Sequence, residues 1–325
     1  MGEFVLIDAI RKHFPDPPAG EIWSGDDAAV FHTGTTNTVF TTDVLVEGVD
    51  FDLAYSPPQS VGFKAMAVNA SDVAAMGGRP HRAVATLSLP PETMWGVVDA
   101  MAQGLAAAGR SLGVDLVGGD ISQASEISLN VAMIGSIEKE PVTRSGARVG
   151  DVICVTGQLG GAAGGLEILR SGRRIDSQDF RALVFRQMQP SPRLKEGQTI
   201  AMRGATSMID ISDGLLADLT HLLDASRVGC RIDLDRVPID DQLTALSDFF
   251  HERGLDISEL AITGGEDFEL LFTIPPERLE PLEGAFREAG TRLSVIGEVT
   301  SDDRLVGDRN LEEWNERGWQ HLRNP

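Results

Sequence analysis

The amino-acid sequence predicts a two-domain α/β (α+β) protein, and three observations support this fold class. The chain has 325 residues, which corresponds to about two domains at roughly 150 residues each. Strand-like and helix-like patterns alternate along it, as in layered α/β folds. A polar, turn-rich stretch over residues 138–150 separates two such blocks. We therefore expect one domain over residues 1–145 and a second over residues 146–325.

The first block alternates strands with two helices. A helix is expected over residues 57–76, because Pro57 favours its start and Gly77 its end. A second helix is expected over residues 92–112. The predicted strands cover residues 38–46, 82–89, 115–117 and 127–137, and the third of them runs into a pair of glycines.

The second block begins with a strand over residues 151–156 and a glycine-rich turn, GQLGGAAGG, which leads into a helix ending near residue 171. Further strands are expected over residues 207–211, 230–234, 267–274 and 293–299, and helices over 214–225 and 276–289. The turn never satisfies the GxGxxG pattern of dinucleotide-binding folds. A tight strand-to-helix turn and a secondary phosphate-binding role both stay open for it.

Composition narrows the class of partner. The chain has 28 Lys plus Arg and 49 Asp plus Glu, a net charge of −21, which argues against nucleic acid or an anionic membrane surface as the main partner. Cys154 and Cys230 lie in apolar, strand-like runs and are expected to be buried thiols. The N-terminal segment resembles an amphipathic helix rather than a signal peptide, so we expect a cytoplasmic protein.

Several common catalytic motifs are absent from the sequence. None of the four lysines follows a glycine, so there is no GxxxxGK[ST] phosphate-binding loop. The six histidines are scattered without zinc-ligand spacing, and no GxSxG nucleophile motif occurs. Zinc chemistry and Ser-His-Asp hydrolysis can therefore be set aside.

Aspartates recur at strand ends, in turns and, in the case of Asp72, on a predicted helix, each among small or apolar neighbours. They are Asp26, Asp27, Asp43, Asp72, Asp120, Asp210 and Asp213. A carboxylate in such surroundings is costly unless a cation or several donors compensate its charge. Oxygen-only ligands select hard ions, so together these residues predict a site for magnesium or manganese.

Simpler roles stay open for individual residues. Asp213 is also placed to cap the helix that follows it, and Asp26 to stabilise its own turn. Arg144 is able to bind a phosphate through its planar fork, or to form a surface salt bridge. Glycines beside several aspartates, and the starts of the helices after Asp213 and after GQLGGAAGG, would offer backbone amides to a phosphate.

In order along nearly the whole chain, the motifs are GEF, SGDDAAV, TTDVLVEGVDF, KAMAVNASDVAAMGG, LVGGD, VTRSGARVGD, QPSPRL, IDISDGLLADL and GGEDFELLF. This ordered set resembles the thiamine-monophosphate kinase family, within the ATP-binding superfamily that contains aminoimidazole ribonucleotide synthetase. The resemblance implies a homodimer in which strands of the N-terminal α/β domains pair to form a dimer sheet or barrel, while the C-terminal α/β domain completes the active site. It also implies ATP binding without a P-loop, several Mg²⁺ ions, and direct transfer of the γ-phosphoryl group to thiamine monophosphate, which yields thiamine diphosphate and ADP.

The resemblance also assigns residues. The implied metal ligands are Asp27, Thr41, Thr42, Asp43, Asp72, Asp120, Asp210 and Asp213. The implied nucleotide contacts are Gly119, Asp120, Arg144 and Ser212, with Asp210 and Asp120 in the catalytic role. The implied substrate contacts are Glu266, Trp319 and Asp50. An indole suits the thiazolium and pyrimidine rings by stacking and cation–π attraction, although an anchoring role for the C-terminal segment is the alternative for Trp319.

The chain departs from the family pattern at Asp50. The family often reads GxHF where this chain reads EGVDF. A carboxylate cannot donate a hydrogen bond to a phosphate as a histidine can, so any contact of Asp50 with substrate would run through a metal ion or a water molecule.

Two alternative functions remain at this point. One is another activity of the same superfamily, such as aminoimidazole ribonucleotide synthetase or selenophosphate synthetase. The latter often has a reactive cysteine near its N-terminus, whereas the first cysteine here is Cys154. The other is a non-catalytic acidic protein that binds divalent ions, which would explain the aspartates but not the ordered glycine motifs.

Overall fold

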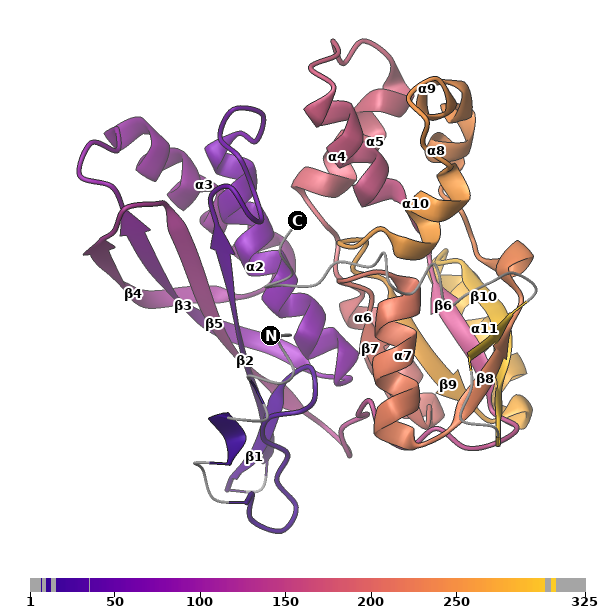
Figure 1. Cartoon of the computed structure of the whole chain (residues 1–325). Helices are drawn as coiled ribbons and strands as arrows, with labels where there is room; N and C mark the ends of the chain where they lie inside the picture. The colour runs from indigo at the N-terminus through magenta and orange to yellow at the C-terminus, as the bar shows by residue number, and fades with distance from the viewer. Residues whose placement is uncertain (1–6, 8–9, 13–15, 35, 302–304, 308–325) are drawn as a thin grey trace.

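The structure, a computed structural model, describes residues 7, 10–12, 16–34, 36–301 and 305–307. Its elements form two α/β units, each built on one mixed sheet, that lie side by side (Figure 1). This agrees with the two-domain α/β fold expected from the sequence. The boundary predicted near residue 145 falls in the segment joining the two sheets, and it stays a prediction.

The first sheet has the strand order β1-β2-β5-β3-β4. Its strands are β1 (Ala29–Thr33), β2 (Thr36–Val46), β3 (Arg79–Leu89), β4 (Asp115–Gln123) and β5 (Ser128–Ile137). All pairings are antiparallel except that of β3 with β4, which is parallel. As the last strand in this order, β4 forms one edge of the sheet.

Helices α2 (Pro58–Ala75) and α3 (Trp95–Leu112) cover one face of this sheet (Figure 1). Alternate strand residues of that face, such as Val39 and Met133, share a core with Met66 and Met101 of the two helices. The opposite face, which we call the open face, has exposed apolar side chains: Phe40, Val44, Val84 and Ile134. The described part of the chain leaves this face uncovered.

The second sheet has the order β11-β8-β10-β6-β9-β7. Its strands are β6 (Val152–Thr156), β7 (Ser207–Asp210), β8 (Gly229–Ile232), β9 (Leu270–Ile274), β10 (Leu293–Thr300) and β11 (Leu305–Gly307). The α-helices of this unit are α4 (Gly161–Arg170), α5 (Gln178–Met188), α6 (Leu194–Arg203), α7 (Leu215–Ser226), α8 (Asp241–Ala245), α9 (Ser247–His251), α10 (Ile257–Thr263) and α11 (Pro276–Ala289).

Helix α2 connects the two units. It contacts β2, β5 and α3 in its own unit and α5, α6 and β7 in the other. It is consequently buried on nearly all sides, which explains why its sequence is rich in Ala and Val rather than amphipathic.

The structure corrects two predicted strands. Strand β4 continues through both glycines to Gln123, because its parallel pairing with β3 persists, with Gly119 opposite Ala85 and Asp120 opposite Thr86. The strand expected over residues 267–274 begins only at β9, because φ is 69° at Glu266 and 51° at Phe268, outside the extended region.

Other sequence predictions concern burial and membranes. Cys154 and Cys230 are both buried, as their apolar surroundings predict. Among the helices that the structure describes, none is long and apolar enough to cross a membrane. The helix expected at the N-terminus falls largely outside the described residues.

Candidate active site

A cleft of about 1970 Å³ is lined by residues of both units, and we call it the central cleft. Most of the site residues expected from the sequence line it: Asp27, Thr41, Thr42, Asp43, Asp50, Asp72, Arg144, Asp210, Ser212, Asp213 and Glu266. The fold thus brings together motifs that are widely separated along the chain.

Three carboxylates from different elements meet in the central cleft. Asp27 precedes β1, Asp72 lies on α2 and Asp210 ends β7, yet one oxygen of each lies within 4.8 Å of the others. Thr41 Oγ1 donates to Asp72 Oδ2 at 2.5 Å, and Ser71 Oγ donates to Asp210 Oδ2 at 2.6 Å. We call Asp27, Asp72 and Asp210 the carboxylate cluster.

Burial makes the ionised form of these acids unfavourable. Burial, then the charge of Asp27, raises the pKa of Asp210 to about 8, although the hydrogen bond from Ser71 opposes the shift. Burial, then the charges of Asp43, Asp210 and Asp27, raises the pKa of Asp72 well above its usual 3.8. Adjacent carboxylates that are desolvated together favour protons or cations as partners.

Arg144 is the cation that the structure places beside this cluster. Its Nη2 donates to Asp27 Oδ1 at 2.6 Å and its Nε to the same oxygen at 3.1 Å, while its backbone N–H donates to Asp26 Oδ1 at 2.8 Å. Burial lowers the pKa of Arg144, but the charge of Asp27, the side-chain hydrogen bonds to it and the charges of Asp26 and Asp210 raise it overall, so the guanidinium stays charged. Arg144 is therefore a cleft residue. The Asp26 carboxylate accepts across the fold from Arg144 N, and the backbone N–H of Asp27 in its own turn also stabilises its ionised form, so a turn-stabilising role for Asp26 stays open.

The donor set of the carboxylate cluster fits a hard divalent cation. The Asp27 side chain is only 1% exposed, and its Oδ2 is buried with no hydrogen-bond partner among the described residues. A buried carboxylate oxygen is costly to leave unsatisfied, and hard oxygen donors are the ligands that Mg²⁺ prefers. Asp27, Asp72 and Asp210 are the residues able to hold such an ion.

The two threonines of the TTD motif point to opposite faces of the first sheet. Thr41 faces Asp72, whereas the hydroxyl of Thr42 donates to Val131 O at 3.1 Å and accepts from Asn130 Nδ2 at 3.1 Å on the open face. Asp50 lies nearby and accepts from the backbone N–H of Val46 at 2.8 Å. The structure thus brings the Thr41 hydroxyl, but not that of Thr42, to the carboxylate cluster.

The sequence suggested that backbone N–H groups at two helix starts could bind phosphate. In the structure, carboxylates of the chain itself accept hydrogen bonds from these N–H groups. Asp218 Oδ2 accepts from the backbone N–H groups of Ser212, Asp213 and Gly214, each at 3.1 Å. Asp267 accepts from Gly160 N at 2.6 Å and from Ala162 N at 3.0 Å. This occupancy favours the tight-turn interpretation of GQLGGAAGG.

Asp213 does not cap helix α7. The N-cap position belongs to Gly214, with no side-chain hydrogen bond. Asp213 instead forms a second group with Asp218 and His221, in which one ligand atom of each lies within 4.8 Å of the others. Burial, then the charge of Arg144, lowers the pKa of His221 to about 4, so its imidazole is neutral at pH 7.

Glu266 lies in the loop between α10 and β9 and is fixed by contacts with the ISDG turn. Its backbone N–H donates to Ser212 O at 2.8 Å. A Cβ atom on the preceding Gly265 would lie 2.3 Å from that same oxygen, so only glycine allows this approach. The side chain forms an ion pair with Lys64 and accepts from Gln187 Nε2 at 2.6 Å.

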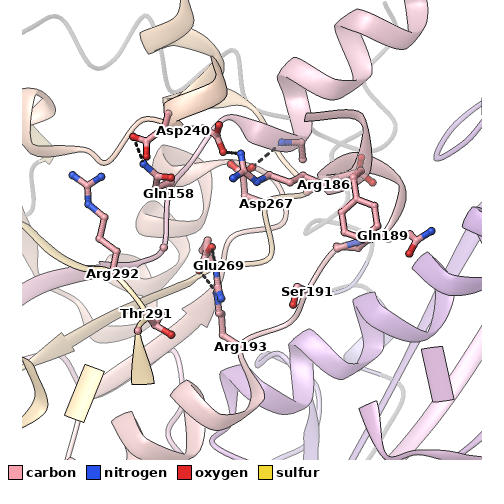
Figure 2. Close-up of a pocket in the computed structure, with 17 residues that line it drawn as sticks. Gln158, Arg186, Gln189, Ser191, Arg193, Asp240, Asp267, Glu269, Thr291 and Arg292 are labelled. Atoms are coloured by element: carbon pink, nitrogen blue, oxygen red, sulfur yellow. Dashed lines mark hydrogen bonds and ion pairs between the residues drawn. The ribbon is translucent and has the colours of Figure 1, made fainter. Parts of the chain in front are cut away.

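Glu266 also lines a second cavity, of about 500 Å³, which Figure 2 shows. The charged side chains around it are largely paired with one another. Arg193 Nε donates to Glu269 Oε2 at 2.6 Å and its Nη2 to Oε1, and Arg186 pairs with Asp240. The Arg193–Glu269 pair holds the residue directly before β9, next to the loop that carries Glu266, and gives Arg193 of the QPSPRL motif a structural contact.

Two groups of expected site residues do not line the central cleft. Gly119 and Asp120 lie on edge strand β4. The register places Asp120 beside Thr86, Asn130 and then Val44, in one row on the open face. Three strand spacings separate the ends of that row, about 14 Å. Trp319 lies outside the described residues.

Sequence reasoning missed Lys64 and Asp218. Both are single charged residues within apolar helical stretches, KAMAV and LLADL, and a lone charge in such a stretch is a signal of a buried polar contact. The lone charge could be recognised in the sequence, but the residue that it would contact could not be predicted.

Two family models match the chain. The model described as AIR synthase related protein, N-terminal domain, matches residues 25–137, and the model described as AIR synthase related protein, C-terminal domain, matches residues 148–309. Together they span both α/β units.

The chain is also similar over its whole length to curated proteins and solved structures. It is 35% identical to the thiamine-monophosphate kinase of Mycobacterium tuberculosis, covering 100% of this chain and 93% of that protein. It is 36% identical to the thiamine-monophosphate kinase of Escherichia coli, covering 100% and 99%. A solved structure, AaThiL complexed with AMPPCP and TMP, superimposes with a TM-score of 0.88 at 35% identity, covering 99% of this chain and 97% of that one.

Proposed function

Since this chain belongs to the thiamine-monophosphate kinase family, we propose that its central cleft transfers the γ-phosphoryl group of ATP directly to thiamine monophosphate. The activity is the ATP-dependent phosphorylation of thiamine monophosphate to thiamine diphosphate, the last step in making that product. The observation that supports this site most directly is the convergence of Asp27, Asp72 and Asp210 from both units, with a buried Asp27 oxygen that has no hydrogen-bond partner in the described part of the chain.

Charge is the main obstacle to this reaction, because both donor and acceptor are phosphates. Mg²⁺ bound at the carboxylate cluster supplies positive charge that offsets their repulsion. Asp27, Asp72, Asp210 and Thr41 would hold it, with Asp43 and Asp213 lining the same cleft for further ions. Arg144 adds a permanent cation next to Asp27, placed to bind a nucleotide phosphate.

The attacking atom needs little activation by the protein. A phosphate oxygen of thiamine monophosphate is already ionised at neutral pH, so no strong general base is required. The residues of the cleft then act by orienting the two phosphates in line and by excluding water. We assign Glu266 to the thiamine end of the substrate, and we keep Trp319 and Asp50 as proposed contacts there, Asp50 through a metal ion or a water molecule.

We further propose that the working enzyme is a homodimer formed through the open face and the β4 edge. Strand β4 is exposed along its whole length, and Val117 and Ile121 on it are exposed apolar residues. An uncovered apolar sheet face next to an unpaired edge is unfavourable in water. In such a dimer, Asp120 and Gly119 of each subunit would lie at the central cleft of the other subunit. They would complete a site that one chain cannot form alone.

The product assay tests the function. Purified protein incubated with ATP, Mg²⁺ and thiamine monophosphate should form thiamine diphosphate and ADP in equal amounts. Replacement of thiamine monophosphate by thiamine, which has no acceptor phosphate, should abolish ADP formation. Failure to form thiamine diphosphate while divalent ions still bind would point to an acidic ion-binding protein instead.

A further inference from the structure

Lys64 is a buried cation in the middle of helix α2. Its side chain is 5% exposed, although lysine is among the residue types least often buried. A buried ammonium group is costly unless an anion pairs with it. The ion-pair partner that the structure shows is Glu266, which belongs to the other α/β unit.

Glu266 is held from both units. Its Oε1 pairs with Lys64 of the first unit, and its Oε2 accepts from Gln187 of α5 at 2.6 Å. The residue adopts φ 69°, a left-handed conformation that is unfavourable for a non-glycine residue and persists only where surrounding contacts enforce it. The side chain remains 30% exposed and lines the central cleft, so the carboxylate, which has more lone pairs than its two protein partners use, can still accept from a ligand.

Lys64 and Asp72 lie on the same face of one rigid helix. Residues 64, 68 and 72 repeat at the four-residue spacing that stacks side chains, and all three line the central cleft. Eight residues at 1.5 Å each separate Lys64 from Asp72 by about 12 Å along the helix axis. One end of this distance lies at the carboxylate cluster and the other at Glu266.

We propose that Lys64 is a positioning residue, which fixes Glu266 to α2 and so sets the distance between the phosphate end and the ring end of thiamine monophosphate. The inference rests on the proposed role of Glu266 as a substrate contact. Lys64 itself need not touch substrate. It holds the carboxylate of Glu266 at a fixed distance from Asp72. The helix thereby fixes the length of the thiamine monophosphate molecule that fits between the two ends of the site.

The test compares Lys64→Met, Lys64→Arg and Glu266→Gln with the control Lys195→Met, which removes an exposed lysine of α6. Lys64→Met should raise the KM for thiamine monophosphate about tenfold, the size of a lost charge-assisted contact, and leave the KM for ATP within about twofold. Lys64→Arg should recover most of the loss. In a Glu266→Gln background, Lys64→Met should add little, because the residue being positioned has already been altered.

Each other outcome has a defined meaning. If Glu266→Gln raises the KM for thiamine monophosphate but Lys64→Met does not, the positioning role is wrong and the proposed function stands. Equal increases in both KM values would also overturn it, since they indicate a general loss of structure. If Glu266→Gln itself changes nothing, the assignment of Glu266 to substrate fails. Calorimetry of thiamine monophosphate binding without ATP allows the same comparison between variants through the Kd. If Lys64→Met does not fold, Lys64→Gln takes its place.

Discussion

At the scale of single residues, the central cleft contains acidic groups that the protein alone does not neutralise. Burial, then the charge of Asp27, raises the pKa of Asp26 to about 7, against the hydrogen bond from Arg144 N and the charge of Arg144. Asp27 shares Arg144 with Asp26 and still has one oxygen without a hydrogen-bond partner among the described residues. This arrangement is unfavourable by itself, and the divalent cation that we propose for the site would make it favourable.

Asp210→Asn tests the cluster at this scale. The amide keeps the size of the side chain but removes a charge that would bind metal, so kcat should fall by about 10² or more while the fold is retained. The concentration of Mg²⁺ needed for half-maximal rate should rise as well. Asp248→Asn, at an exposed position of α9, is the matched control. Unaltered turnover and Mg²⁺ dependence in Asp210→Asn would remove this residue from the site.

The local surroundings of a residue decided which site residues the sequence could predict. Asp27, Asp72 and Asp210 were predictable because a carboxylate among small or apolar neighbours needs compensation. Lys64 and Asp218 were not, because what they do depends on partners contributed by distant segments or by a turn geometry that the sequence pattern does not show. The same limit applies to the amides at the helix starts, which carboxylates of the chain already occupy.

At the scale of elements, β4 carries Asp120 and is the strand through which we propose that a partner subunit completes the site. Within one chain Asp120 projects from the open face, whereas Asp72 and Thr41 lie on the helix-covered side of the sheet. We predicted that this strand would end at its glycines, since glycine is a poor strand former. It continues past them because pairing with β3 outweighs that propensity. Helices α5, α6, α8, α9 and α10 were not predicted, and of these α8 and α9 have only 5 residues each, too few for a periodic pattern.

Subunit complementation tests the proposed contribution of β4. Asp120→Asn and Asp210→Asn homodimers should each be nearly inactive. A heterodimer with one chain of each kind, purified through two different tags, contains one intact site and one doubly altered site. It should therefore recover about half of the wild-type activity. A heterodimer as inactive as its parents would contradict a site shared between subunits.

At the scale of the whole molecule, the acidity of the chain links folding to metal and pH. The net charge of −21 opposes binding to large polyanions, but small phosphates can bind to cations that the aspartates recruit. The pKa values of Asp26 and Asp210, about 7 and about 8, lie above the ordinary 3.8, so folding favours their protonated forms. Stability of the metal-free protein should then fall as pH rises from about 4 to about 8.

Calorimetry with EDTA and with Mg²⁺ measures this linkage. We expect the Tm of the metal-free protein to drop by several degrees between pH 5 and pH 8. Added Mg²⁺ should raise the Tm more at pH 8 than at pH 5, because it binds the ionised carboxylates. Asp210→Asn should reduce both effects. A Tm increase from Mg²⁺ that is the same at both pH values would show that these carboxylates are not the ligands.

Rapid-quench analysis with γ-labelled ATP tests the central claim most directly, which is direct phosphoryl transfer in the central cleft without a covalent intermediate. The label should pass from ATP to thiamine diphosphate at the rate of ADP formation, and the protein should stay unlabelled whether or not thiamine monophosphate is present. Label trapped on the protein before the acceptor is added, and then chased into thiamine diphosphate, would contradict the account.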